Sequence, residues 1–203
     1  MDKSRNYLLN HEQDIWIVAG IFFSICLSLQ VLRMHSLIAS MDQGILYQVL
    51  WNALQGHPFE STLSSQLSTN VIHGGELPAV GYHRLGQHFT PILFIWTPIV
   101  ALLGKWGLPI IQVSLITGSG LILYKLSRLE LEIGLAKTIT VSYFCANALI
   151  GPCLGNFTDL SQLPLCFFGL IFGIKRRIKW LIFVTAFSMP LIREDVGIVL
   201  IGI

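Results

Sequence analysis

Residues 15–32 read IWIVAGIFFSICLSLQVL, a run of eighteen residues without a charged side chain. At about 1.5 Å of rise per residue, a helix of this length reaches ~27 Å, close to the ~30 Å of a bilayer's hydrocarbon core. The run is longer than the ~7–15 apolar residues of a signal peptide, and no convincing A-x-A cleavage site follows it. We therefore expect an uncleaved first transmembrane helix.

The composition of the whole chain agrees with a membrane protein. Of its 203 residues, 53% are apolar and 12% are charged, with a mean hydropathy of +0.68; soluble domains are about one quarter charged. The net charge of +2 is small and scattered, which argues against nucleic acid as a partner. The four cysteines lie in apolar runs without C-x-x-C spacing, as is typical of buried small side chains.

Five further apolar segments follow, at 88–104, 108–124, 133–151, 160–174 and 180–203. The distribution of basic residues indicates which of them cross the membrane. If 88–104 dips into the outer interface without crossing, nine basic residues become cytoplasmic: Lys3, Arg5, Lys125, Arg128, Lys137, Lys175, Arg176, Arg177 and Lys179. Pro91 and Pro98 also favour a re-entrant or interfacial path for this short segment.

We therefore predict an all-α fold, a polytopic transmembrane helix bundle that forms a single domain over residues 1–203. The predicted spans are 15–32, 108–124, 135–152, 160–174 and 180–203, with a cytoplasmic N-terminus and an outer loop at 33–107. The last apolar segment runs to Ile203 without a polar tail. We expect this chain to be an N-terminal fragment of a longer protein, truncated at its C-terminus.

The outer loop opens with signals for a helix. Residues 40–43 read SMDQ, the S-x-x-Q pattern of a capping box in which Ser40 caps the backbone and Gln43 reaches back. Gly56 and Pro58 are typical helix stop signals, so we predict a helix over 41–55. Its apolar and amide side chains fall on different faces. An amphipathic helix of this kind lies naturally along the outer membrane surface.

Asp42 lies in the first turn of this predicted helix. The helix dipole and the free backbone N–H groups there favour an ionised carboxylate. One interpretation is a residue that simply starts the helix, and the other is a general base held at the membrane–water boundary. The local sequence leaves both open.

Residues 59–81 are rich in Ser, Thr, Gly and Asn and indicate a surface loop; YHRLGQHFTP follows at 82–91. His83 and His88 are five positions apart and do not share a helix face, so we predict no metal site. A divalent cation stays an unsupported alternative, because the loop holds six candidate ligands: His35, Asp42, His57, His73, His83 and His88. His88 is either a site residue or an interfacial cap of the next helix.

Arg193, Glu194 and Asp195 interrupt the last apolar segment. A charge at the bilayer centre costs roughly 2.5–3.5 kcal/mol, and residues 180–192 reach only ~20 Å, so we expect the triplet at or just below the outer surface. The triplet is either an ion pair at a helix end or the lining of a water-filled cavity, where the planar guanidinium of Arg193 suits a phosphate. We interpret Asp159, in a short outer turn, as a helix cap.

Three segments, in this order, resemble an uncharacterised family of predicted prokaryotic polytopic membrane proteins. MDQGILYQVLWNALQGHPF at 41–59 resembles the family pattern D-x-G-x-x-x-Q-x-x-W-N…G-x-P-F. HFTPI at 88–92 resembles H-F-S-P-I, and RED at 193–195 resembles a late K-E-D. Thr90 and Arg193 are mild departures from serine and lysine. The family's F-H-P motif has only a loose counterpart in GNFTD at 155–159.

This family is similar in architecture to the C-type (GT-C) membrane glycosyltransferases, which take sugar from a polyprenyl-phosphate donor and carry an acidic residue in the first outer loop. The resemblance implies that Asp42 is the catalytic base, that His88 borders the site and that Arg193 binds the donor phosphate. We add Glu194 and Asp195 as substrate-binding residues. The expected location is the bacterial inner membrane, with the lipid bilayer and a polyprenyl-phosphate-linked sugar as partners and with no cofactor.

We therefore expect a membrane glycosyltransferase-like protein that acts on the outer face of the membrane, and that is inactive if the fragment lacks part of the fold. One alternative is a transporter or channel subunit, in which Arg193, Glu194 and Asp195 mark an ion or proton path. Another is a non-catalytic membrane scaffold. The large outer loop favours the enzyme, because a simple transporter needs no amphipathic helix with an acid at its tip.

Overall fold

The computed structural model describes residues 3–36, 38, 40–64, 83–84 and 88–202. In chain order its elements are α1 (Lys3–His35), α2 (Met41–Leu54), η2 (Pro91–Trp96), α4 (Thr97–Leu103), η3 (Gly104–Trp106), α5 (Gly107–Ser127), α6 (Ile133–Cys145), α7 (Asn147–Leu154), η4 (Asp159–Gln162), α8 (Leu163–Arg176), α9 (Lys179–Ile192) and α10 (Val196–Ile201). Each of these elements is helical, which confirms the predicted all-α class. Most of the predicted surface loop at 59–81 lies outside the described residues.

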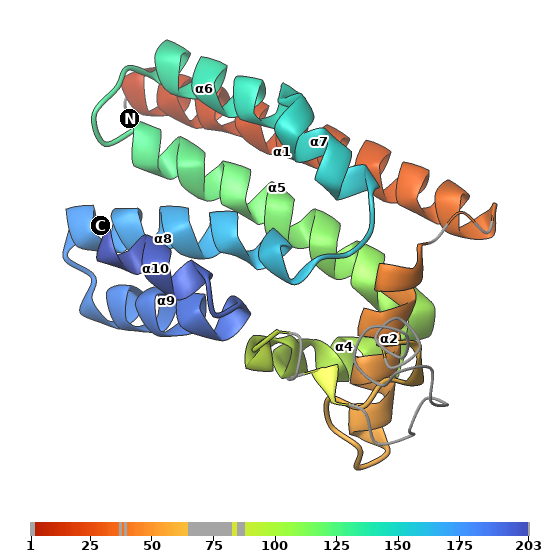
Figure 1. Cartoon of the computed structure of the whole chain (residues 1–203). Helices are drawn as coiled ribbons and strands as arrows, with labels where there is room; N and C mark the ends of the chain where they lie inside the picture. The colour runs from red at the N-terminus through yellow and green to blue at the C-terminus, as the bar shows by residue number, and fades with distance from the viewer. Residues whose placement is uncertain (1–2, 37, 39, 65–82, 85–87, 203) are drawn as a thin grey trace.

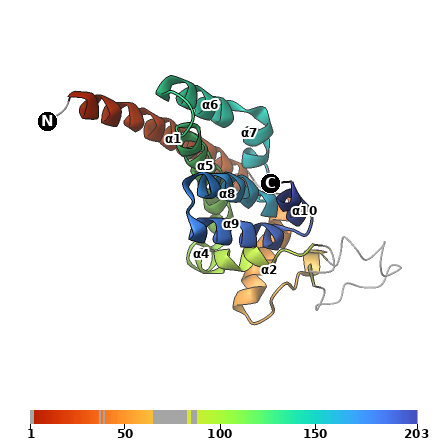
Figure 2. The ribbon, with the colours of Figure 1, turned by 90° about the vertical axis from the view of Figure 1, so that its left-hand side faces the viewer.

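The helices α1, α5, α6, α8 and α9 lie side by side and make the bundle (Figure 1). The central helix is α5, which packs against α1, α6 and α8, while α9 packs against the far side of α8. The N-terminal part of α1 projects beyond the other helices (Figure 2). The arrangement agrees with the predicted membrane helix bundle.

Small residues let α5 and its neighbours approach closely. A Cβ on Gly120 of α5 would lie only 2.5 Å from Cε1 of Phe144 of α6. The Phe144 ring in turn stacks on Phe22 of α1, with 4.7 Å between the ring centroids. Such contacts matter because membrane helices associate mainly through close packing at small residues.

The chain between α1 and α5 leaves and rejoins the bundle at the same end. Gln30, near the end of α1, donates to the carbonyl oxygen of Cys153 at 2.5 Å. Gln112, near the start of α5, donates to the same oxygen at 3.3 Å. The segment between α1 and α5 therefore begins and ends at the same height along the bundle axis, as expected for the predicted outer loop. Within this segment α4 packs against α2 beside the bundle end (Figure 1).

Charged residues bridge the helices at the opposite end. Lys137 at the start of α6 lies 2.6 Å from Asp14 of α1, and Lys175 at the end of α8 lies 3.0 Å from Glu130. Along α1, Asp14 and Gln30 are separated by about 24 Å. One end of the bundle therefore carries the α2 segment and the other carries these basic residues, as the positive-inside argument expects. The side of the membrane on which each end lies stays a prediction.

Two stretches of the described residues are long and apolar enough to cross a membrane, Gln13–His35 and Pro91–Ser127, and the bent pair of α6 and α7 would be a third. The second stretch is interrupted at Gly104, whose φ of 55° and ψ of −136° separate α4 from α5. The predicted span 135–152 contains a 45° bend between α6 and α7. The predicted span 180–203 is not continuous either, because α9 ends at Ile192.

The start of α2 is as predicted, but its capping box is not formed. Ser40 precedes the helix and makes no side-chain cap bond. Gln43 is buried, and its amide lies 3.7 Å from the sulfur of Met34 at the end of α1. Tertiary packing has therefore drawn Gln43 away from the helix N-terminus.

The apolar face of α2 is covered by protein. Leu46 and Leu50 are buried in one cluster with Leu93, Val100 and Leu108, which come from η2, α4 and α5. The amphipathic pattern of α2 thus reflects packing onto the bundle end, whereas the sequence suggested that this face meets the membrane surface. The packing fixes the orientation of Asp42, which lies on the exposed side of the first turn.

Candidate functional site

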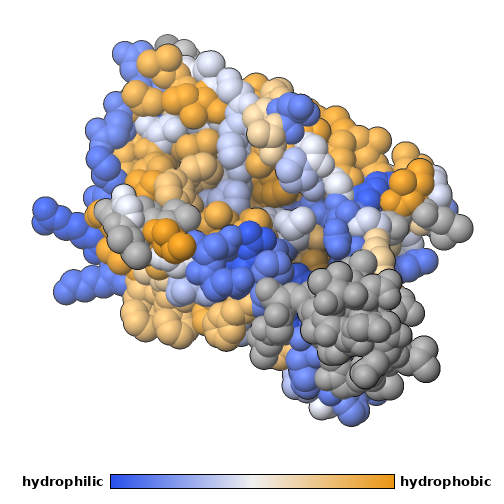
Figure 3. All heavy atoms as spheres, viewed as in Figure 1, coloured by the Kyte–Doolittle hydropathy of each residue, from blue (hydrophilic) through white to orange (hydrophobic). Residues whose placement is uncertain are grey.

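A cavity of about 490 Å³ lies at the end of the bundle that carries α2. Its apolar walls come mainly from α5, α7 and the start of α8, including Ile116, Leu149 and Pro164. Its charged or titratable lining residues are Asp42, Arg84, His88, Asp159 and Arg193. In the view of Figure 1, hydrophilic residues gather in the middle of the face between hydrophobic surfaces (Figure 3). The cavity is therefore amphipathic, with apolar walls and a group of charges.

Three site residues chosen from the sequence meet in this cavity. Asp42 from α2, His88 from the segment before η2, and Arg193 from the end of α9 all line it. Glu194 and Asp195 do not line the cavity, but each contacts a residue that does. The structure thus brings the five predicted residues into one region. Their catalytic and binding roles stay a prediction.

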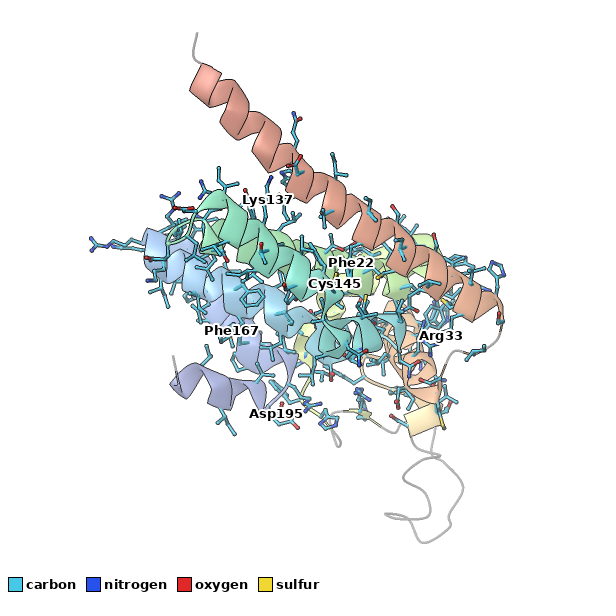
Figure 4. All side chains as sticks on the ribbon, turned by 90° about the horizontal axis from the view of Figure 1, so that it is seen from above. Phe22, Arg33, Lys137, Cys145, Phe167 and Asp195 are labelled. Atoms are coloured by element: carbon cyan, nitrogen blue, oxygen red, sulfur yellow. The ribbon has the colours of Figure 1, made fainter. Side chains whose placement is uncertain are left out.

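Arg193 is held by a two-point contact with Asp195. It follows the last residue of α9 in an extended conformation, and donates through Nε to Oδ1 at 2.9 Å and through Nη2 to Oδ2 at 2.5 Å. Such bidentate pairs are geometrically specific. Figure 4 shows Asp195 beside the start of α10.

His88 is held by Glu194, the middle residue of the triplet. Its Nδ1 lies 3.0 Å from Oε1 of Glu194, and the backbone N–H of Phe89 donates to Oε2 at 2.8 Å. The carboxylate of Glu194 therefore ties the segment before η2 to the turn between α9 and α10.

Arg84 and Asp159 form a third pair, which the sequence did not identify. Nη2 of Arg84 lies 3.7 Å from Oδ2 of Asp159, and only 12% and 7% of the two side chains are exposed. Asp159 was interpreted as a helix cap, but Thr158 occupies that position and Asp159 begins η4. Arg84 lies within the quoted YHRLGQH stretch, and Asp159 within the loose counterpart of a family motif. No other feature of the sequence pointed to these two residues as parts of the site.

Side chains of α1 and α5 anchor the loop that carries Asp159. Arg33 donates to the carbonyl oxygen of Leu154 at 2.9 Å, and also to the carbonyl of Gly155 and to Oδ1 of Asn156. Gln112 donates to the carbonyl of Pro152 at 2.6 Å. Figure 4 shows Arg33 at the end of α1, on the side of α7. The anchored backbone holds the loop against the cavity.

The described histidines of the outer loop, His35, His57, His83 and His88, do not converge on a metal centre. Among the residues that the structure describes, no group of three His, Cys, Asp or Glu side chains is placed to hold a metal ion. His57 and His83 instead flank Glu60, at 3.4 Å and 3.9 Å from its carboxylate oxygens. His73 lies outside the described residues.

A family model described as "Predicted membrane protein (DUF2079)" matches residues 33–203. The chain belongs to this family. The DUF2079 match begins at Arg33, which anchors the loop, and covers every charged residue of the cavity. Together with the long apolar helices, it identifies an integral membrane protein that resides in the lipid bilayer. No curated protein and no solved structure matches the chain.

Proposed function

We propose that this DUF2079 protein is a membrane glycosyltransferase that moves a sugar from a polyprenyl-phosphate donor to an acceptor hydroxyl on the outer face of the bacterial inner membrane. The observation that carries the proposal is the shared cavity of Asp42, His88 and Arg193, residues far apart in the sequence. The resemblance of their motifs to C-type glycosyltransferases supports the same assignment.

The proposed reaction needs a base and a cation at opposite sides of the sugar. Asp42 accepts the proton of the acceptor hydroxyl, whose oxygen attacks the anomeric carbon. The bond between that carbon and the phosphate oxygen breaks, and polyprenyl phosphate leaves with the electron pair. Arg193 stabilises the charge on the leaving phosphate, and its contact with Asp195 fixes its orientation before the substrate binds.

The amphipathic cavity also suits a lipid-linked donor. Small-molecule pockets usually measure about 300–1,000 Å³, and the cavity of about 490 Å³ falls in this range. Apolar side chains from α5 and α7, such as Ile116 and Leu149, suit the first isoprene units. The charged residues suit the phosphate and the sugar hydroxyls. A donor that is apolar at one end and anionic at the other matches both surfaces.

The test is a transfer assay with the chain in lipid nanodiscs and a panel of radiolabelled polyprenyl-phosphate sugars. Asp42→Asn should lower the turnover about 10²–10⁴-fold, because it removes the base and keeps the shape of the side chain. The control is Glu130→Gln, which removes a carboxylate at the opposite end of the bundle and should leave the rate unchanged. Unchanged transfer by Asp42→Asn would refute the base. A wild-type protein of full natural length that transfers no sugar from any donor would refute the function.

A further inference from the structure

The two arginines of the cavity differ in how fully their donors are used. Arg193 makes two short hydrogen bonds to Asp195, at 2.9 Å and 2.5 Å. Arg84 approaches Asp159 only to 3.7 Å, beyond the usual 2.7–3.2 Å range for a hydrogen bond. Within the described part of the chain, Nε of Arg84 and Oδ2 of Asp159 are buried and have no hydrogen-bond partner. Arg84 therefore keeps unused donors at the cavity wall.

An unused cationic donor in a buried position needs an explanation. Native proteins satisfy most of their buried polar groups, and a buried donor without a hydrogen-bond partner is unfavourable. The side chain of Arg84 is only 12% exposed, yet it lines the cavity. A ligand that brings oxygen atoms to this wall would complete its hydrogen bonding.

The backbone around Arg84 fixes where those donors lie. Its N–H donates to the carbonyl oxygen of Phe59 at 2.9 Å, and its own carbonyl accepts from the N–H of His88 at 3.0 Å. His88 is itself tied to Glu194. Arg84 is thus part of the same wall as the predicted site residues, and its position is set before any ligand enters.

We propose that Arg84 is the main phosphate-binding residue of the cavity, and that Asp159 is a counter-ion which the phosphate of a polyprenyl phosphate displaces. This inference rests on the proposed function for the identity of the lipid. A guanidinium presents a planar fork of donors that matches two phosphate oxygens, so the exchange replaces a long contact by two short ones. Arg193 keeps its aspartate and contributes the donors that Asp195 leaves free.

The charge balance of the cavity favours such an exchange. Its four charged lining residues, Asp42, Arg84, Asp159 and Arg193, sum to zero. Asp195, which pairs with Arg193, adds a negative charge beside the cavity. A phosphate therefore meets no excess of positive charge, and it binds more tightly when it takes an arginine from its carboxylate. The 3.7 Å contact of Asp159 is the easier of the two to give up. Neutralising Asp159 should for this reason strengthen phosphate binding.

The test measures binding to the chain in nanodiscs, without any sugar transfer. The probes are a polyprenyl phosphate, the matching polyprenol that lacks the phosphate, and inorganic phosphate. The wild type should prefer the polyprenyl phosphate over the polyprenol, and Arg84→Gln should weaken phosphate-lipid binding about 10–100-fold, as expected for loss of hydrogen bonds to a charged group. Asp159→Asn should tighten the binding of the polyprenyl phosphate by roughly 3–10-fold, because the variant removes the carboxylate that competes for Arg84.

The thermal stability of each variant is compared with that of the wild type, to show that the variant is folded. Arg84→Lys keeps the positive charge without the planar fork, and should bind the polyprenyl phosphate more weakly than the wild type. Binding by Arg84→Gln equal to the wild type would overturn the proposal. Weaker binding by a folded Asp159→Asn would show that the aspartate positions Arg84, and would overturn the displacement. Inorganic phosphate that binds as tightly as the lipid would exclude the lipid as the specific ligand. Binding through Arg84 without any sugar transfer would refute the proposed function alone.

Discussion

Gly120 gives a sharp test of how the bundle packs. A Cβ at this position in α5 would lie 2.5 Å from Cε1 of Phe144, whereas a Cβ at Gly118 would lie at an ordinary 3.5 Å from Cδ1 of Leu165. The Phe144 ring has little freedom to move away, because it is 4% exposed and stacks on Phe22 at 4.7 Å. Gly120→Ala should therefore destabilise the bundle, with Gly118→Ala as its matched control.

The size of the effect follows from the difference between the two variants. Replacing glycine by alanine inside a helix gains about 1 kcal/mol, and this gain is common to both positions in α5. Carbon atoms pack at about 3.5–4.0 Å, so Phe144 or its helix would have to shift by roughly 1 Å. Overpacking of this kind costs about 1–3 kcal/mol. Gly120→Ala should thus be less stable than Gly118→Ala by about 1–3 kcal/mol.

The assay is thermal unfolding of both variants in the same detergent. For a chain of this length, each kcal/mol changes Tm by about 2–4 °C, so the two variants should differ by about 2–12 °C. A second substitution, Phe144→Leu, should restore most of the loss in Gly120→Ala by making room for the new methyl group. Equal Tm values for the two alanine variants would refute the close packing of α5 on α6.

Three further predictions concern the segments around the cavity. Arg33→Met removes the charged donor to Leu154 and its neighbours and should lower the unfolding free energy by about 1.5–3 kcal/mol, measured by thermal unfolding; an unchanged Tm would contradict the anchoring role. Leu50→Ala, at a buried position of α2, should cost about 2–5 kcal/mol, whereas Leu54→Ala, at an exposed one, should cost little; equal losses would mean that α2 does not pack as described. Glu194→Gln should lower Tm, because it removes the negative charge that accepts hydrogen bonds from His88 and from the backbone N–H of Phe89; an unchanged Tm in thermal unfolding would argue against the contact with His88.

Local sequence patterns predicted the limits of a helix well where start and stop signals lie at its two ends. The signals at Ser40 and Gly56 predicted a helix over 41–55, and α2 spans Met41–Leu54. The prediction of α2 succeeded because helix start and stop signals are properties of short segments. That 88–104 does not cross the membrane stays a prediction, and the bonds of Gln30 and Gln112 to one carbonyl oxygen are consistent with it.

Sequence patterns could not predict which charged residues contact each other. The pairs Arg84–Asp159 and His88–Glu194 join segments that meet only in the folded bundle. Asp159 looked like a helix cap because its neighbours in the sequence suit a turn. The capping box at Ser40 failed for the related reason that tertiary packing drew Gln43 toward Met34. Interactions set by long-range packing overrode the local preference in both cases.

The central claim is that the charged cavity lies at the outer side of the membrane and the basic helix ends lie in the cytoplasm. Single cysteines at Lys105 and Arg176, both exposed in the structure, test it in a background without native cysteines. A membrane-impermeant maleimide added to intact cells should label Lys105→Cys, and should label Arg176→Cys only after the membrane is opened. Labelling of Arg176→Cys in intact cells, with Lys105→Cys protected, would contradict the account.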